Sequence, residues 1–219
     1  MKIRLDEEIN KLKKTLLEMG NAVEESIGLV IKSLKERDTV LAKKVIRDDS
    51  LVNRLEVLVD KTCLKIFALK QPIAVDLRFV ASSLKVNNDL ERIGDFASRI
   101  AEEIIGLSNE TDTPEADELY QMAEITQEMV KLCLEAFMQG NVDIAKQVIQ
   151  KDSEVDKLYE NLIKTIGPYV HEDSERFEIG LAFINIGKSL ERIGDHAKNI
   201  CEDAIYLAEG EIVKHRKDH

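Results

Sequence analysis

Apolar residues recur along the chain in steps of three and four, the spacing of an amphipathic helix. The first run covers residues 5–34, and a second keeps seven-residue steps over residues 45–66. Polar turn residues separate the runs, first around Asp38 and then at Pro72. The pattern therefore predicts long helices that are joined by short turns.

The second half of the chain repeats the pattern of the first half. Residues 42–55 (AKKVIRDDSLVNRL) match residues 145–158 (AKQVIQKDSEVDKL), and the hexapeptide LERIGD occurs at residues 90–95 and again at residues 190–195. Short turns between long helices favour antiparallel neighbours. The sequence therefore predicts an all-α fold of two tandem, pseudo-symmetric three-helix bundles, with six long helices.

A polar stretch, SNETDTPEADE, interrupts the helical pattern between the two halves. Such a stretch is typical of a boundary between repeats. We expect a first repeat at residues 1–108, a linker at residues 109–114 and a second repeat at residues 115–219. Pro114 suits the first position of the next helix, and Thr113 can cap that helix.

Each copy of the hexapeptide places two carboxylates one helical turn apart. These are Glu91 with Asp95, and Glu191 with Asp195. They lie beside the apolar stripe, on the flank of the predicted bundle. A glycine such as Gly94 costs about 1 kcal/mol relative to alanine inside a helix. We interpret it as leaving the carboxylates uncovered, so that another backbone or a ligand can approach.

The second helix of each repeat adds oxygen ligands that are also four residues apart. These are Asp49 with Asn53, and Asp152 with Asp156. Antiparallel helices can bring both sets together, and oxygen ligands from two helices suit a hard cation such as Mg²⁺, Mn²⁺ or ferric iron. An isolated acidic pair on a helix is far more often a solvated, salt-bridged face than a metal site. The duplication is what raises the hypothesis of a metal site.

The net charge of the chain limits the kinds of molecule that it can bind. The chain has 219 residues and a formal net charge of −11, so nucleic-acid binding would need a local basic stripe. Arg78, Lys85, Arg92 and Arg99 recur every seven residues, but the second repeat keeps only Arg192 of them. We therefore expect a docking surface or a salt-bridged face here, and no nucleic-acid binding.

The motifs of common enzyme classes are missing. The sequence contains no GxxxxGK loop, no GxSxG elbow, no HExxH motif and no Glu-x-x-His pair of the helical di-iron oxidases. The start of the chain, MKIRLDEEINKLKK, lacks the apolar centre of a signal peptide, and no stretch approaches the roughly 20 apolar residues of a membrane span. We expect a cytoplasmic protein that has no enzyme activity and no membrane span.

Four further side chains are expected to be structural. The cysteines Cys63, Cys133 and Cys201 lie far apart on helical segments, which predicts buried, reduced thiols. His196 follows the second hexapeptide, and a lone histidine there is expected to pack between helices and not to bind a metal.

Taken together, the motifs resemble the PhoU family of phosphate-uptake regulators over essentially the whole chain. The resemblance rests on both LERIGD copies, on QPIAVDLRFVASSLKVNNDLERIGD at residues 71–95, and on the segments DSLVNRL and DSEVDKL. It implies a non-enzymatic cytoplasmic regulator, peripheral to the inner membrane through its partners. These partners are the ATPase subunit of the phosphate ABC transporter and a phosphate sensor histidine kinase. It implies that the phosphate regulon is kept off when phosphate is plentiful.

The resemblance also implies metal binding by the paired acidic motifs, in some family members as iron clusters. Asn53 departs from the acidic pattern, which predicts a weaker site or a different ion in the first repeat. A homodimer is a further expected assembly. Two alternatives stay open: a metal-free helical scaffold or co-chaperone-like protein, and a carboxylate-bridged metalloenzyme, against which the missing histidines argue. The positions that match the acidic motifs are Glu91, Asp95, Glu191, Asp195, Asp152 and Asp156.

Overall fold

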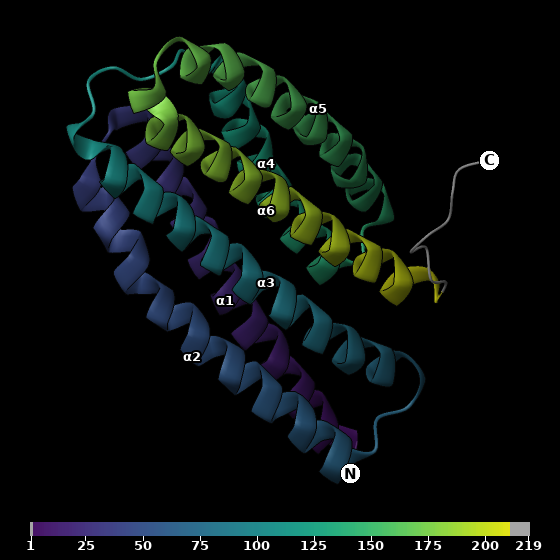
Figure 1. Ribbon diagram of the computed structural model, residues 1–219. Helices are drawn as coiled ribbons and strands as arrows, with labels where there is room; N and C mark the ends of the chain where they lie inside the picture. The colour runs from purple at the N-terminus through teal and green to yellow at the C-terminus, as the bar shows by residue number, and fades with distance from the viewer. Residues whose placement is uncertain (1, 211–219) are drawn as a thin grey trace.

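The computed structural model describes residues 2–210, and their side chains from Leu5 onward. This part of the chain consists of long helices with two short 3₁₀ turns and contains no strand, so the predicted all-α fold of two three-helix units is confirmed (Figure 1). The elements are α1 (Lys2–Glu36), α2 (Thr39–Lys70), α3 (Ala74–Gly106), η1 (Leu107–Asn109), α4 (Asp117–Gln139), α5 (Val142–Glu172), η2 (Ser174–Arg176) and α6 (Phe177–Glu209).

Side-chain caps and a glycine set the helix boundaries. Oδ1 of Asp38 accepts hydrogen bonds from two backbone N–H groups at the start of α2, and Oδ1 of Asn141 does the same for α5. Helix α4 ends at Gly140, whose φ of 64° lies in the left-handed region that glycine adopts without strain. The predicted turn at Asp38 is therefore confirmed.

The linker between the units is longer than expected. Helix α4 begins at Asp117, so the prediction that Thr113 caps it was wrong. The Oγ1 atom of Thr113 instead accepts a hydrogen bond from the guanidinium group of Arg37, at the end of α1. On the other side, the hydroxyl group of Tyr169 donates to the backbone oxygen of Asp112 at 2.8 Å. The linker is thus fastened to both units. The predicted repeat limits at residues 1 and 219 lie outside the described residues.

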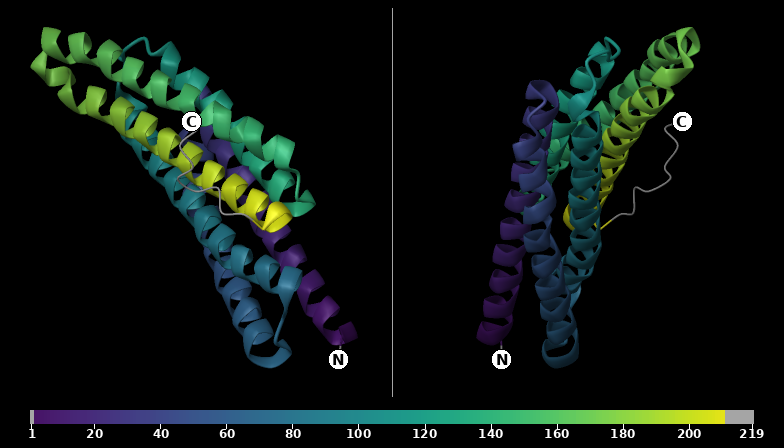
Figure 2. Two further views of the ribbon diagram at one scale, coloured as in Figure 1. Left: turned by 90° about the vertical axis from the view of Figure 1, so that its right-hand side faces the viewer. Right: turned by 60° about the vertical axis from the view of Figure 1, so that its left-hand side comes forward.

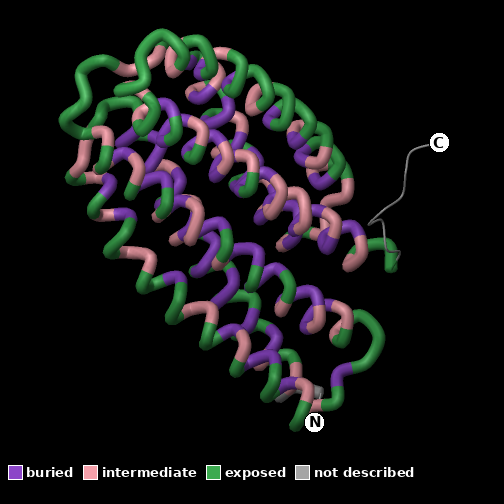
Figure 3. The backbone as a smooth tube through the Cα atoms, viewed as in Figure 1, coloured by how far each residue is buried: buried purple, intermediate pink, exposed green. Residues whose placement is uncertain are grey.

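All six helices contribute to one core. On α1, for example, Leu12, Met19 and Val30 have no exposed surface. Phe79 of α3 stacks on Phe137 of α4 with ring centroids 6.0 Å apart, so apolar contact continues from the first unit into the second. Figure 3 shows the buried positions along the inward sides of the helices.

The cysteines belong to the buried interior, as predicted. All three are free thiols, and none forms a disulfide. Burial raises the pKa of Cys63 and of Cys201 to about 12. These thiols therefore stay protonated at neutral pH and act as small apolar side chains.

Helices α3 and α6, which carry the two hexapeptides, pack antiparallel at the joint between the units (Figures 1 and 2). His196 packs between them, as predicted, with Nδ1 2.8 Å from Oδ1 of Asp89. Two further contacts across this joint join equivalent positions of the two repeats. They are Lys85 Nζ to Asp203 Oδ1 at 2.9 Å and Asn185 Nδ2 to Glu103 Oε1 at 2.9 Å.

Most side chains of the basic stripe of α3 make contacts within the molecule. Lys85 pairs with Asp203, which is only 2% exposed, and the Arg92 guanidinium lies 3.1 Å from Oδ2 of Asp95. The guanidinium of Arg99 lies over the ring of Phe96. These contacts favour a salt-bridged face over a free docking surface, because charge reversal at Lys85 would place a second negative charge beside a buried carboxylate.

We predict that Lys85→Met lowers the free energy of unfolding by about 1.5–3 kcal/mol, because the buried Asp203 carboxylate loses its charged partner. The other oxygen of that carboxylate already has no hydrogen-bond partner in the described part of the chain. Urea denaturation followed by circular dichroism measures the change. Lys61→Met, on the exposed side of α2, is the matched control and should change stability by less than about 0.5 kcal/mol. Equal losses in both variants would contradict a structural role for Lys85.

Candidate functional site

The first acidic cluster lies on a flank of the first unit, where α2 passes α3. We define it as Asp49, Asn53 and Glu56 of α2 with Glu91 and Asp95 of α3. Nδ2 of Asn53 donates to Oδ2 of Asp49 at 3.0 Å. The Glu91 and Asp95 side chains are 17% and 30% exposed, so solvent reaches them only in part. The predicted ligands of the first repeat therefore lie along the facing flanks of two neighbouring helices, α2 and α3.

Gly94 allows the two helices to approach each other at this cluster. A Cβ atom built on Gly94 would lie 3.3 Å from Oδ1 of Asp49 and 3.4 Å from Cγ1 of Val52, both on α2. The glycine is buried beneath α2, so the interpretation that it leaves the carboxylates uncovered was wrong. The sequence also suggested that Gly94 lets another part of the backbone approach, and the close packing of α2 against it fits that interpretation. The missing side chain brings a carboxylate of α2 against the helix that carries Glu91.

Crowding of like charges shifts the titration of the first cluster. Burial raises the pKa of Asp49, and the Asp95 carboxylate adds to that rise. Burial also raises the pKa of Glu91, and the carboxylates of Asp95, Glu56 and Asp49 add to the effect against the opposing charge of Arg92. The cluster thus keeps its negative charge at a cost, which a bound cation would relieve.

The second acidic cluster occupies the equivalent flank of the second unit. We define it as Asp152 and Asp156 of α5 with Glu191 and Asp195 of α6. Asp152 is 3% exposed, and its Oδ1 would lie 3.6 Å from a Cβ atom on Gly194. Burial raises the pKa of Asp156, and the three other carboxylates add to the rise. The duplication of the sequence is therefore a duplication of the acidic cluster.

Lysines distinguish the second cluster from the first. Nζ of Lys198 donates to Oδ2 of Asp152 at 2.5 Å, and Nζ of Lys188 donates to Oε1 of Glu191 at 2.7 Å. The equivalent positions in the first repeat hold Asn88 and Ser98, which carry no charge. Both clusters also contain one arginine on the hexapeptide, paired to its aspartate at 3.1 Å. Four carboxylates thus face one cation in the first cluster and three in the second.

The donor chemistry of both clusters fits a hard cation. The ligands are carboxylates and, in the first cluster, an amide, and neither cluster contains the imidazole or thiolate groups that zinc prefers. Oε2 of Glu191 is buried and has no hydrogen-bond partner within residues 2–210. In the same part of the chain, no three His, Cys, Asp or Glu side chains already converge as a metal site. Binding therefore requires the carboxylates to rotate toward a common point.

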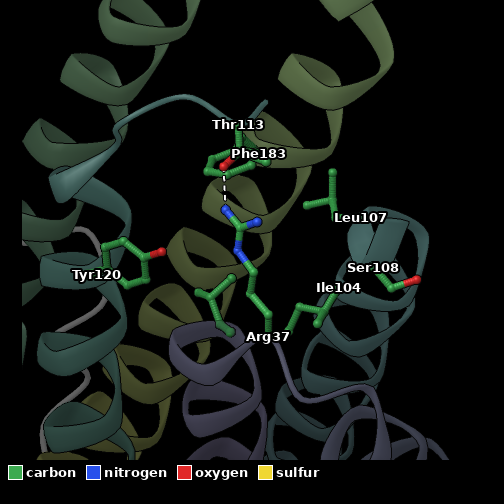
Figure 4. Close-up of a pocket in the computed structure, with 8 residues that line it drawn as sticks. Arg37, Ile104, Leu107, Ser108, Thr113, Tyr120 and Phe183 are labelled. Carbon is green, nitrogen blue, oxygen red and sulfur yellow. Dashed lines mark hydrogen bonds between the residues drawn. The ribbon is translucent and has the colours of Figure 1, made fainter. Parts of the chain in front are cut away.

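A separate pocket lies at the end of the first unit, beneath the linker (Figure 4). The side chain of Arg37 reaches through it to Thr113, and apolar side chains of α1, α3 and α6 form most of its wall. Its cavity volume is about 30 Å³, room for little more than a water molecule. No carboxylate or histidine lines it. The pocket therefore serves to anchor the linker and is too small for a substrate. Its lining residues are Leu34, Arg37, Ile104, Leu107, Ser108, Thr113, Tyr120 and Phe183.

Comparison with known proteins decides the family. The PhoU domain profile matches the chain twice, over residues 16–104 and residues 119–204. The phosphate-specific transport system accessory protein PhoU homolog of Pseudomonas aeruginosa is 38% identical over 209 residues, which cover 95% of this chain and 86% of that protein. The chain belongs to the PhoU family. The PhoU homolog of Aquifex aeolicus is also 38% identical, with 98% and 97% of the two chains covered.

Crystal structures of PhoU proteins share the fold. PhoU from Pseudomonas aeruginosa superposes with a TM-score of 0.91 at 37% sequence identity and covers 94% of this chain and 99% of its own. The phosphate transport system regulatory protein PhoU from Streptococcus pneumoniae gives 0.87 at 32% identity, with 95% and 99% covered. No helix within residues 2–210 is long and apolar enough to cross a membrane.

Sequence reasoning missed one residue of the second acidic cluster. Lys198 was not singled out, although it makes the closest charged contact of the second cluster, with Asp152. The signal was available in the repeat itself, because alignment of the two hexapeptides places Ser98 opposite Lys198. A position whose charge differs between two otherwise matching repeats can therefore mark a difference between their clusters.

We predict that Glu91→Gln raises the melting temperature at neutral pH in the presence of a chelator. The folded protein raises the pKa of Glu91, so its ionised form opposes folding at neutral pH, and this penalty disappears as pH falls through the raised pKa. The gain should therefore shrink in the acid range. Differential scanning calorimetry across pH measures it, with Glu154→Gln on exposed α5 surface as the control. A loss of stability at neutral pH would contradict the crowding of carboxylates.

Proposed function

We propose that this chain is a non-enzymatic accessory regulator of phosphate-specific transport, acting in the cytoplasm. The observation that carries the proposal is the match over 95–98% of the chain to proteins named for that role in Pseudomonas aeruginosa, Aquifex aeolicus and Escherichia coli. The family profile matches both repeats, and its two matched ranges span the positions of both acidic clusters, so the likeness covers the whole molecule and not one shared module.

The proposed partners are the ATPase subunit of the phosphate ABC transporter and the sensor histidine kinase of the phosphate regulon. A protein of this kind controls transport by binding, so its output depends on exposed helical surfaces. The exposed sides of α2 and α5 lie away from the joint between the units and are candidates for such surfaces (Figures 1 and 2). A homodimer is a further assembly that would use them.

A hard cation at the first cluster is the second part of the proposal. Asp49, Glu91 and Asp95 would hold it, together with the amide oxygen of Asn53. The cation would neutralise crowded carboxylates and link α2 to α3. What supports this is the raised pKa of two of these carboxylates and the single arginine that opposes them.

The two clusters should bind cations unequally. The sequence alone favours a weaker first site, because Asn53 replaces a carboxylate. The contacts of the second cluster argue that the second site is the weaker one. Lys198 already forms an ion pair with Asp152, and Lys188 forms one with Glu191. A cation must displace these ammonium groups there, whereas it meets only Arg92 in the first cluster.

We predict that isothermal titration with Mn²⁺ or Mg²⁺ detects one dominant site. The double variant Glu91→Gln with Asp95→Asn should lose it, and the matched double variant Glu191→Gln with Asp195→Asn should keep it. Lys198→Met should add a second site, because it frees the Asp152 carboxylate. Absence of binding in the wild type, or equal losses in the two double variants, would sink the proposed order of the sites.

The regulatory role is tested in cells that carry this chain. Deletion of its gene should switch on a phosphate-starvation reporter in phosphate-rich medium, and the wild-type chain should restore repression. Immobilised chain should capture the purified transporter ATPase subunit or the sensor kinase. If deletion leaves the reporter silent and neither protein is captured, the scaffold or co-chaperone alternative is favoured. Metal-dependent redox turnover by the purified chain would favour the metalloenzyme alternative.

A further inference from the structure

Exposed large apolar side chains are unevenly distributed over the molecule. Within residues 2–210, ten of the fourteen lie between Val40 and Leu77, on α2 and at the turn into α3. The most exposed group stands around that turn, with exposed fractions from 44% at Leu77 to 75% at Ile73. We call this group the α2–α3 tip. Its members are Leu64, Leu69, Ile73, Val75 and Leu77.

The tip is a projecting end of the molecule. The views in Figures 1 and 2 show the turn between α2 and α3 extending past the ends of α4, α5 and α6. Gln71 and Ala74 adopt φ values of 47° and 48°, which side-chain-bearing residues rarely do, and Pro72 between them is buried. The turn therefore has a defined shape, and Ile73 is 75% exposed on it.

The tip also lies in a basic segment of an acidic protein. Between residues 61 and 78 the chain has four cationic side chains and one acid, Asp76, although the whole protein carries a net charge of −11. One of the four, Lys65, pairs with Glu8 of α1. An anionic surface would attract this end and repel the remainder, which orients the molecule with the tip forward. The cationic residues are Lys61, Lys65, Lys70 and Arg78.

The second repeat shows that the fold does not require such a tip. At the end of α5, Glu172 stands where the first repeat has Leu69. In the following turn, Asp173 and Glu175 take the positions of Ile73 and Val75. The same architecture thus ends in acidic residues in one unit and in aliphatic and basic residues in the other. The stability of the fold therefore does not explain the exposed aliphatic side chains of the first unit, which points to a binding role.

We propose that the α2–α3 tip inserts into the headgroup region of an anionic lipid bilayer. Aliphatic side chains beside lysine and arginine are the composition of surfaces that lie in a membrane interface. A protein partner is less well matched, because the tip has none of the tryptophan or tyrosine anchors that dominate protein interfaces. Direct lipid contact would hold the chain beside membrane proteins without a membrane-spanning helix.

Fluorescence gives a direct test, because the chain contains no tryptophan. Ile73→Trp should shift its emission to shorter wavelength with protein-free vesicles of phosphatidylcholine and phosphatidylglycerol, and brominated lipids should quench it. Phe177→Trp, at the corresponding turn of the second unit and 54% exposed, is the matched control and should not respond. Vesicles of phosphatidylcholine alone, or high salt, should weaken the response of Ile73→Trp.

Vesicle flotation tests the same inference without a tryptophan. The double variant Leu69→Asp with Ile73→Asp should bind anionic vesicles more than about tenfold more weakly than the wild type, while Phe177→Asp binds normally. Circular dichroism confirms that both variants stay folded. Failure of the wild type to bind, or full binding by the double variant, overturns the proposal. So does an Ile73→Trp signal that responds to the purified transporter ATPase subunit and not to vesicles. These vesicles contain no protein, so such a failure leaves the transport proposal standing.

Discussion

The antiparallel contact of α3 with α6 is the interaction on which the remaining arrangement depends. Each of these helices completes the core of its own unit with one apolar stripe and meets the other unit with a second, more polar side. Lys85 with Asp203 and Asp89 with His196 fix the register of that polar side. The apolar stripe and the polar side of each helix are then both buried in contacts. One flank of α3 therefore faces α2, one flank of α6 faces α5, and the acidic clusters lie on those flanks.

The LERIGD hexapeptide combines these requirements in six residues. Its leucine and isoleucine, Leu90 and Ile93 in the first copy, are fully buried in the core. The glycine lets α2 approach, and the arginine pairs with the final aspartate. The two carboxylates then stand at the edge of a close helix crossing. The residue that costs the helix most is thus the one that brings oxygen atoms of two helices together.

The sequence predicts the fold almost completely, because the information is local. Hydrophobic periodicity gives six helices, and Asp38 and Asn141 act as caps through contacts with their own neighbours. Errors arise where distant residues compete: Thr113 looks like a cap, but its hydroxyl accepts a hydrogen bond from Arg37, which follows α1. The site follows the same rule. The repeated sequence predicts the acidic pairs, because each pair lies within one helix. The charge that neutralises Asp152 comes from Lys198, which lies on a different helix.

The two clusters are therefore unequal within a symmetric fold: each has four carboxylates, but the first has one cationic side chain and the second has three. Anomalous diffraction from crystals grown with Mn²⁺ tests it most directly, since the manganese edge locates each ion without altering any residue. We expect the strongest anomalous peak between α2 and α3, beside Asp49, Glu91 and Asp95, and a weak peak or none beside Asp152. Peaks of equal height in the two units, or a peak in the second unit alone, would contradict the account.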